Sequence, residues 1–147
     1  MVQGTSATRL DPESPDRLVS LRRALGVTSF GINQLVLRPG QRMRIHRHRR
    51  QEEVYLVIEG RLTVVIEDEP SDLGPGELMR VAPAVRRQLV NRGPDRVVLV
   101  ALGGDGEHDG RDAEAFTAWE QTSGAEPRDV PFPDDLTPEQ LRAQPGA

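Results

Sequence analysis

The sequence predicts an all-β protein, an antiparallel β-sandwich or β-barrel with short helices at its ends. Between residues 30 and 102, short runs of aliphatic and β-branched residues alternate with turn residues such as glycine, proline and asparagine. The gaps between these runs are too short to hold the crossover connections that parallel strands require. No repeat of 20–50 residues is visible, so a solenoid or a propeller is not expected.

Seven strands are expected in this part of the chain. They cover residues 30–37, 42–46, 53–58, 61–67, 78–81, 86–91 and 96–102. Turn sequences such as Pro39-Gly40 and Gly74-Pro75-Gly76 separate them. The stretch Asp68–Asp72, which contains Pro70, is interpreted as a further turn.

The segment before the strands is expected to hold a disordered leader and one short helix. Ser14-Pro15-Asp16 has the form of a helix start, with an N-cap, a first-turn proline and an acidic residue. Leu18, Leu21 and Leu25 follow at helical spacing, and Gly26 is placed to end the helix. The N-terminus lacks the hydrophobic stretch of a signal peptide, which indicates a cytoplasmic protein.

The segment after Gly104 is expected to be an acidic tail that packs on the strands. Phe116 and Trp119 stand one helical turn apart and are expected to close an open end of the barrel. Thr137-Pro138-Glu139-Gln140 has the form of a capping box, so a last short helix is expected to begin there.

Composition excludes several kinds of chemistry. The 147 residues include no cysteine, which excludes disulfides, zinc–thiolate sites, iron–sulfur clusters and thiol catalysis. All 19 basic residues are arginine, so a lysine Schiff base and a P-loop are excluded as well. No run of 18 apolar residues exists, and no membrane partner is expected. Any metal must therefore be held by nitrogen and oxygen ligands, and the chain has only three histidines.

Charge is distributed unevenly along the chain. Residues 105–147 carry 11 acidic residues and 3 arginines, whereas residues 1–104 carry 12 acidic residues and 16 arginines. A basic body with an acidic tail raises the question of nucleic-acid binding. The positive excess is small and aromatic residues make up only 3% of the chain, so base stacking has little support. No nucleic-acid partner is expected.

One stretch in the middle of the chain carries the strongest functional signal. In an extended strand, residues two apart share a face, so His46 and His48 project together with Arg44 on the same side. On the next strand, Glu53 and Tyr55 share one face. If the two strands meet, two imidazoles and one carboxylate form the facial set that non-haem iron and other divalent metals favour. The alternative is a solvated basic strand whose arginines balance the neighbouring acidic residues.

The spacing of these residues resembles the first motif of the cupin family. Five positions match that motif in full, and they are Gly40, His46, His48, Glu53 and Gly60. The second cupin motif is matched only in part. Gly76 and Asn91 stand at its glycine and asparagine positions, and Pro83 comes one residue late. Arg87 occupies the position of the motif's histidine.

The resemblance implies a jelly-roll barrel over residues 27–104 with its ligand site inside. Residues 1–26 would then be a leader with a short helix, and residues 105–147 an acidic tail. In cupins the two motifs bind a divalent metal, commonly iron, manganese, nickel or zinc, which here makes His46, His48 and Glu53 the metal ligands. The resemblance also implies a homodimer, and no organic cofactor is expected.

Arg87 leaves three arrangements open, because a guanidinium stays protonated and cannot coordinate a metal. Arg87 pairs with Glu53 and fills the metal position. Alternatively, Arg87 stands beside a three-ligand metal and binds an anionic group of the substrate. In the third arrangement, His108 reaches in from the tail as the missing ligand. Arg87, Arg44 and Tyr55 are the candidates for substrate binding.

Three classes of function follow from these arrangements. An enzyme, an oxygenase, isomerase or lyase of cupin type, would use a bound metal to transform a small anionic organic molecule. A binding protein would use the same cavity without metal to sense or sequester a metabolite. An interaction module would bind acidic partners through its arginine-rich stretch. The sequence assigns no catalytic residue and no particular substrate.

Overall fold

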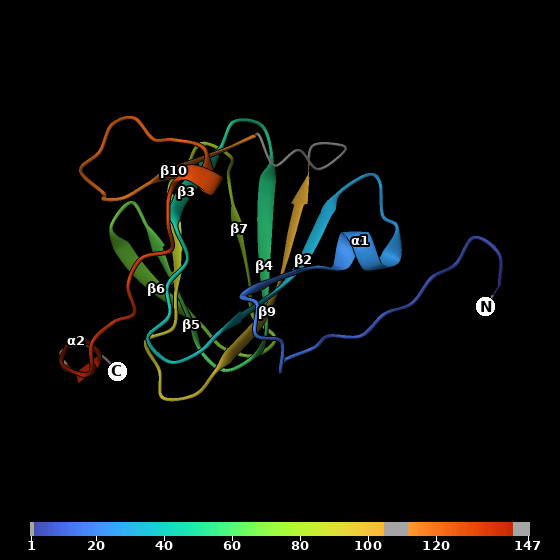
Figure 1. Cartoon of the computed structure of the whole chain (residues 1–147), viewed down its shortest axis with the longest axis horizontal. Coiled ribbons are helices and arrows are strands. Elements are labelled where there is room, and N and C mark those ends of the chain that lie inside the picture. The colour runs from blue at the N-terminus through green and yellow to red at the C-terminus, as the bar shows by residue number, and fades with distance from the viewer. Residues whose placement is uncertain (1, 105–111, 143–147) are drawn as a thin grey trace.

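The computed structural model describes residues 2–104 and 112–142 and confirms the all-β fold class. Ten strands form two five-stranded antiparallel sheets that pack face to face, with short helices at the ends (Figure 1). The strands are β1 (Leu18–Ser20), β2 (Gly31–Leu37), β3 (Ile45–His48), β4 (Glu52–Glu59), β5 (Leu62–Ile66), β6 (Glu69–Leu73), β7 (Leu78–Val81), β8 (Arg87–Val90), β9 (Val97–Gly104) and β10 (Ala113–Phe116). The helical turns are α1 (Leu21–Leu25), η2 (Pro127–Asp129) and α2 (Pro138–Arg142).

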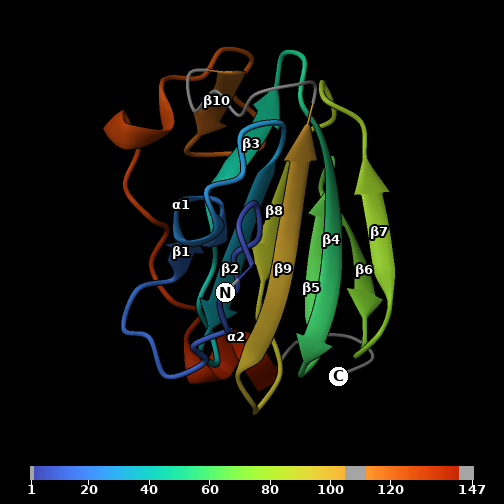
Figure 2. The ribbon, with the colours of Figure 1, turned by 90° about the vertical axis from the view of Figure 1, so that its right-hand side faces the viewer.

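The strand order places residues far apart in sequence on facing surfaces. The first sheet has the order β1-β2-β9-β4-β7, and the second has the order β10-β3-β8-β5-β6. In Figure 2, β9 and β4 of the first sheet lie in front of β8 and β5 of the second. Because side chains alternate between the two faces of a strand, every second residue points into the space between the sheets.

The core lies between the two sheets and is aliphatic, with one tyrosine. It includes residues of both sheets, so strands that are distant in sequence pack on the same core. Its buried members are Leu35, Leu37, Met43, Tyr55, Val57, Leu62, Val64, Leu73, Val81, Leu89, Val97, Leu99 and Ala101.

The N-terminal part differs from the expected helix. Leu18–Ser20 is a strand, β1, that pairs with β2, and α1 begins only after it. Ser20, not Ser14, caps the helix, and its hydroxyl accepts a hydrogen bond from the amide of Arg23 at 3.1 Å. Pairing along the edge of β2 therefore outweighs the helical spacing of the leucines. Gly26 ends α1 in the left-handed conformation, as predicted.

Besides β1, two further strands were not predicted. The prediction of a turn over Asp68–Asp72 is wrong, because β6 covers most of this stretch and pairs with β5. Pro70 is tolerated there since β6 lies at the edge of its sheet and needs no donor on its outer side. The turn is shorter and consists of Glu67 and Asp68, which both have positive φ, as in a type I′ hairpin.

The second unpredicted strand is β10, which pairs with β3. Phe116 ends this strand and Trp119 lies in the turn that follows, so the two residues do not lie on one helical turn. Farther along, the capping box is confirmed. The Thr137 hydroxyl accepts from the amide of Gln140 at 3.1 Å, and the Gln140 side chain accepts from the amide of Thr137 at 2.8 Å. None of the helices in the described ranges is long and apolar enough to cross a membrane.

We expect the turn between β4 and β5 to depend on Gly60. Its φ is +82°, and an added Cβ would lie 2.2 Å from the carbonyl oxygen of Arg96. Gly60→Ala should therefore lower the free energy of unfolding by more than about 2 kcal/mol, because a left-handed backbone alone costs about 1–2 kcal/mol. Urea denaturation followed by circular dichroism measures this loss.

Gly76→Ala is the matched control for that variant. Gly76 has φ +83° but meets no atom within 4 Å at its Cβ position. The Gly76→Ala variant should lose only the cost of the left-handed backbone, about 1 kcal/mol of unfolding free energy. Equal losses in the two variants would contradict the role assigned to the close contact at Gly60.

Candidate metal centre and ligand cavity

A cavity of about 390 Å³ opens between the two sheets beside α1. Its walls are apolar and its mouth is rich in arginine, and four polar residues of β3 and β4 reach into it. The lining residues are Leu18, Ser20, Arg22, Arg23, Gly31, Asn33, Leu35, Met43, Arg44, His46, His48, Glu53, Tyr55, Leu89, Ala101, Ala113 and Pro127.

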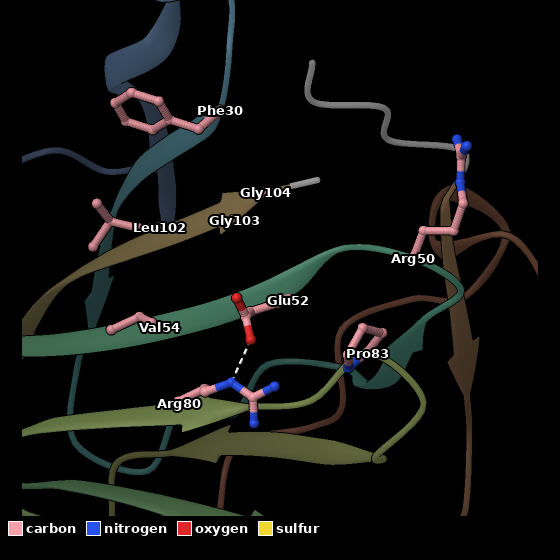
Figure 3. Close-up of a pocket in the computed structure, with 9 residues that line it drawn as sticks. All are labelled: Phe30, Arg50, Glu52, Val54, Arg80, Pro83, Leu102, Gly103 and Gly104. Carbon is pink, nitrogen blue, oxygen red and sulfur yellow. Dashed lines mark hydrogen bonds and ion pairs between the residues drawn. The ribbon is translucent and has the colours of Figure 1, made fainter. Parts of the chain in front are cut away.

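A wider and more open hollow, about 780 Å³, lies on the outer face of the first sheet (Figure 3). Glu52 and Arg80 form an ion pair across it, from β4 to β7. Neither histidine of β3 lines this hollow. We therefore place the functional site in the smaller cavity between the sheets.

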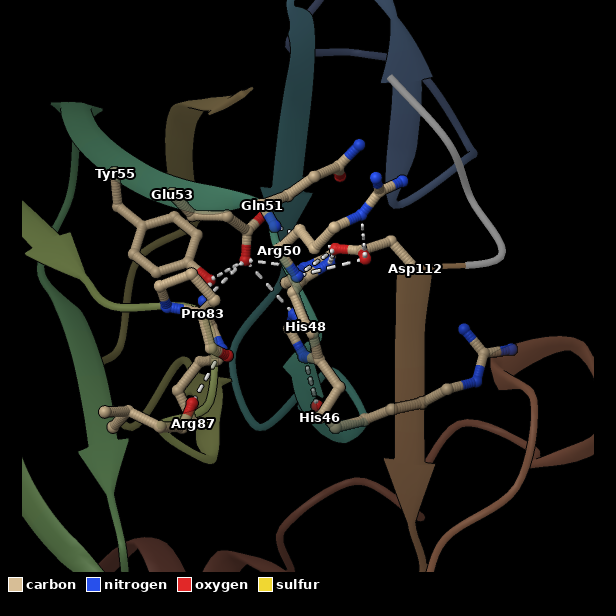
Figure 4. Close-up of polar contacts among 11 residues, drawn as sticks. His46, His48, Arg50, Gln51, Glu53, Tyr55, Pro83, Arg87 and Asp112 are labelled. Atoms are coloured by element: carbon tan, nitrogen blue, oxygen red, sulfur yellow. Dashed lines mark hydrogen bonds and ion pairs between the residues drawn. The ribbon is translucent and has the colours of Figure 1, made fainter. Parts of the chain in front are cut away.

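The strand pattern brings His46, His48 and Glu53 together, as the sequence predicts. His46 and His48 are two residues apart on β3, so both project from the second sheet toward the first. Glu53 and Tyr55 are two residues apart on β4 of the first sheet and project the other way. Figure 4 shows these side chains meeting between the strands. The candidate ligand atoms of His46, His48 and Glu53 all lie within 4.8 Å of one another.

One carboxylate oxygen stands at the centre of this group. Glu53 Oε1 lies 3.3 Å from His46 Nε2 and 3.1 Å from His48 Nε2. The Tyr55 hydroxyl donates a hydrogen bond to the same oxygen at 2.8 Å. The carboxylate is thus approached from both sheets at once.

Burial and charge set the protonation of this group. Burial alone would raise the pKa of the Glu53 carboxyl, but its contacts with His46 and His48 outweigh it and hold the pKa well below its usual range. Burial and the Glu53 charge raise the pKa of Tyr55 well above its usual value. The site therefore contains an ionised carboxylate beside a neutral phenol that donates to it.

Both histidines face oxygen atoms on both ring nitrogens. His46 Nδ1 lies 3.2 Å from the carbonyl oxygen of Arg44, and His48 Nδ1 lies 3.5 Å from Asp112 Oδ2. The Nε2 atoms face Glu53. A neutral imidazole has one donor and one acceptor nitrogen, so one end of each ring meets an oxygen without a proton between them. Both ring nitrogens of His48 are buried, and neither has a partner with hydrogen-bond geometry among the described residues.

A divalent cation fits this donor set. If the Nδ1 atoms carry the protons, the Nε2 lone pairs and the Glu53 oxygen, whose atoms lie within 4.8 Å of one another, are free to bind a cation, which would remove the conflict. Two ligand atoms that each lie about 2.1 Å from an ion are about 3.0 Å apart in octahedral cis positions and about 3.4 Å apart in a tetrahedron. The separations of 3.1 and 3.3 Å lie in this range.

Arg87, on β8 of the second sheet, contacts the Glu53 carboxylate of the first sheet. It is opposite His46 in the pairing of β8 with β3, and its side chain is fully buried. Its Nη2 lies 3.3 Å from Glu53 Oε1, and its Nε donates to the Tyr55 hydroxyl at 3.3 Å. Its Nη1 donates to two backbone carbonyl oxygens, those of Pro83 and Val85.

Arg87 and Glu53 lie within ion-pair distance, as the first of the three arrangements requires, and whether Arg87 also fills the metal position stays a prediction. Arg87 does not line the cavity, and its guanidinium is directed at protein groups. Its contact with a substrate stays a prediction. The third arrangement involves His108, which lies outside the described residues.

Arg44 and Tyr55 both line the cavity. Arg44 is held at the mouth by the C-terminal segment, because its Nε donates to the carbonyl of Val130 and its guanidinium stacks 4.1 Å from the Phe132 ring. Burial and the charge of Arg17 lower the pKa of Arg44. No carboxylate of the described chain lies within ion-pair distance of its guanidinium, so its charge is available to an anion.

Asp112 was missed by the sequence analysis. Its carboxylate contacts His48 and accepts hydrogen bonds from the amides of Arg50, at 3.1 Å, and Gln51, at 2.8 Å. Burial raises the pKa of Asp112, but these backbone donors outweigh it and lower the pKa. The residue lies in a segment interpreted as an acidic tail, and only the pairing of β10 with β3 brings it to the site.

Comparison with known proteins agrees with the fold. A family model described as the cupin domain matches residues 33–103, the part of the chain that carries the strands and the histidine cluster. No curated protein shows significant similarity to the chain.

Many solved structures share the fold. A cupin protein from Bacteroides fragilis superposes with a TM-score of 0.62 at 20% identity, over 71% of this chain and 86% of that one. A Cupin 2 conserved barrel domain protein from Salinispora arenicola gives 0.61 at 21% identity, over 70% and 91%. A sugar phosphate isomerase from a cupin superfamily, from Silicibacter pomeroyi, gives 0.60 at 27% identity, over 70% and 68%.

The buried pair of Arg87 and Glu53 leads to a stability prediction. Arg87→Met keeps most of the side-chain volume but leaves the Glu53 carboxylate without its buried cation. Measured in chelator, the variant should lose about 3–5 kcal/mol of unfolding free energy. The double variant Arg87→Met/Glu53→Gln should recover part of that loss, because it removes the orphaned charge. Additive losses in a double-mutant cycle would contradict the coupling.

Proposed function

We propose that this chain, whose residues 33–103 match a cupin domain model, is a metal-dependent cupin that binds a small anionic organic molecule between its sheets. One observation carries the proposal. His46, His48 and Glu53 gather their ligand atoms at the inner surface of a cavity that arginines line. Metal ligands and a cationic mouth in one cavity are the parts that such a function needs.

The metal half of the proposal rests on His46, His48 and Glu53. Two neutral imidazoles and one carboxylate suit iron, manganese, nickel or zinc, and three protein ligands leave positions open for a bound molecule. A divalent ion held there would supply Lewis-acid chemistry or oxygen activation. Tyr55 keeps its proton on the phenolic oxygen and directs it at Glu53, which holds the carboxylate in place.

The anionic half rests on the charges around the cavity. Arg23 and Arg44 line it, and Glu53 is the one acidic residue among its described lining residues. A molecule with a carboxylate or phosphate group would offset this excess, since a guanidinium binds such groups through paired hydrogen bonds. The similar isomerase from Silicibacter pomeroyi is described as acting on a sugar phosphate, which is consistent with an anionic ligand.

A second candidate function is a metal-free binding protein. It is favoured by the contact of Arg87 with the same Glu53 oxygen that a metal would use. In that case the ion pair closes the metal position, and the cavity with its arginines binds a metabolite without transforming it. An arginine-rich interaction module has less support, because Arg47 and Arg50 of that stretch lie beside Glu114 and Asp112. The homodimer that the family resemblance implies stays a prediction.

Metal content decides between the two candidates. After treatment with chelator and reloading with iron, manganese, nickel or zinc, we expect about one ion per subunit by elemental analysis. His46→Ala and His48→Ala should abolish retention, because two remaining ligands seldom hold a dication at micromolar levels. Glu53→Gln should weaken retention strongly, since it removes the only negative ligand.

Arg87→His is the informative comparison for that experiment. It offers a fourth ligand and removes a neighbouring positive charge, so metal affinity should rise. An empty wild type with a fully loaded Arg87→His variant would support the metal-free binding protein instead. No metal in either protein would show that the ligand assignment is wrong.

Arg44 should carry the anion affinity of the cavity. Inorganic phosphate and oxalate are suitable probes, with binding measured by calorimetry on metal-loaded protein. Arg44→Gln should weaken their binding about tenfold or more, because a hydrogen bond to a charged group contributes about 1.5–3 kcal/mol. Metal content should not change.

Arg42→Gln is the control for Arg44→Gln. Arg42 also donates to the C-terminal segment, at the Asp134 carbonyl, but does not line the cavity. The Arg42→Gln variant should bind phosphate and oxalate as tightly as the wild type does. An equal loss in both variants would mean that the effect arises from the C-terminal segment and not from the charge at the mouth.

A further inference from the structure

We propose that Asp112 is a positioning residue of the candidate metal centre, whose carboxylate keeps the proton of His48 on Nδ1 and so presents Nε2 to a cation. The inference rests on the proposed function, because it concerns the same centre. It adds a residue outside the cupin-matched region, residues 33–103, to the machinery of the site.

The position of Asp112 is built by the fold. Its side chain is 4% exposed, and its Oδ2 lies 3.5 Å from His48 Nδ1. The same oxygen accepts from the amide of Gln51 at 2.8 Å, and both oxygens lie 3.1 Å from the amide of Arg50. The carboxylate is therefore fixed by backbone amides of the turn between β3 and β4, and Figure 4 shows it near His48.

A fixed carboxylate at this place decides which ring nitrogen carries the proton. A lone pair on His48 Nδ1 would face a buried negative charge, whereas an N–H bond there faces it favourably. The Nδ1–H form leaves the lone pair on Nε2, which points at Glu53 and the candidate metal position. Carboxylates that orient metal-binding histidines in this way commonly change metal affinity by about 10–100-fold when they are replaced.

The two histidines differ in how they are oriented. His46 Nδ1 faces a neutral backbone carbonyl, that of Arg44. His48 faces a charged side chain that comes from a distant part of the chain. The effect of Asp112 should therefore fall on His48 and leave His46 unchanged.

A purely structural role for Asp112 is the alternative, because the residue also fixes the turn between β3 and β4. Asp112→Asn separates the two roles. The amide oxygen of asparagine can still accept from the backbone amides of Arg50 and Gln51, and the volume is preserved. Only the negative charge beside His48 is lost. Asp112→Ala removes both the charge and the acceptor.

Glu114→Gln is the matched control. Glu114 lies on β10, two residues after Asp112, accepts a backbone hydrogen bond from Gly124 at 2.7 Å and pairs with Arg47 at 3.0 Å. It has no contact with either histidine among the described interactions. Removing its charge tests whether the loss of any carboxylate in this segment changes metal affinity and the His48 tautomer.

The experiment measures two quantities on the full chain. Zinc affinity is determined by competition with a chelator, and the tautomers of His46 and His48 are read from the ¹⁵N shifts of their ring nitrogens in metal-free protein at pH 8. Asp112→Asn should weaken zinc binding about 10–100-fold and shift His48 toward the Nε2–H form. His46 and the Glu114→Gln variant should behave as in the wild type.

Two outcomes would overturn the proposal. One is wild-type zinc affinity in Asp112→Asn with a loss only in Asp112→Ala, which would leave Asp112 a structural role alone. The other is an unchanged His48 tautomer in Asp112→Asn. If the wild type binds no zinc, the proposed function fails, and the tautomer measurement in metal-free protein still decides the role of Asp112 separately.

Discussion

The site depends on one buried carboxylate oxygen, Glu53 Oε1. It receives the Tyr55 hydroxyl from its own strand and faces Arg87 and the two histidines of the second sheet. A buried carboxylate is costly unless cations or donors surround it, so these contacts tie the two sheets together at this point. The same requirement explains why a fully buried arginine is tolerated in a core that is otherwise almost entirely aliphatic.

That oxygen also defines the central chemical question of the protein. Arg87 and a divalent ion would both be attracted to Glu53, and two cations held a few ångströms apart repel each other by several kcal/mol at an effective dielectric near 20. In the Nδ1–H form that we propose, each histidine would offer a lone pair at Nε2 and would shift this balance toward a cation. The balance between the Arg87–Glu53 ion pair and a bound metal therefore depends on Arg87, Glu53 and the two histidines together.

The C-terminal segment belongs to the site more closely than an acidic tail would. β10 extends the sheet beside the histidine strand, and Asp112 at its start contacts His48. Farther along, Val130 and Phe132 hold Arg44 at the mouth of the cavity. A cavity formed by the two sheets is thus completed by residues that follow them in the chain. The acidic residues Asp112 and Glu114 of this segment contact individual partners, His48 and Arg47.

The sequence by itself determined the fold class, most strands and the facing of His46, His48 and Glu53. These follow from local rules, since side-chain alternation and turn residues are written in short stretches. Tertiary structure decided the rest. β6 and β10 are strands because neighbouring edges were free to pair with them, although Pro70 and the spacing of Phe116 and Trp119 indicated otherwise. Likewise, Asp112 reaches His48 only because β10 pairs with β3, and Arg87 reaches Glu53 only because the two sheets stack. Contacts between strands that are distant in the chain have no signature in the local sequence.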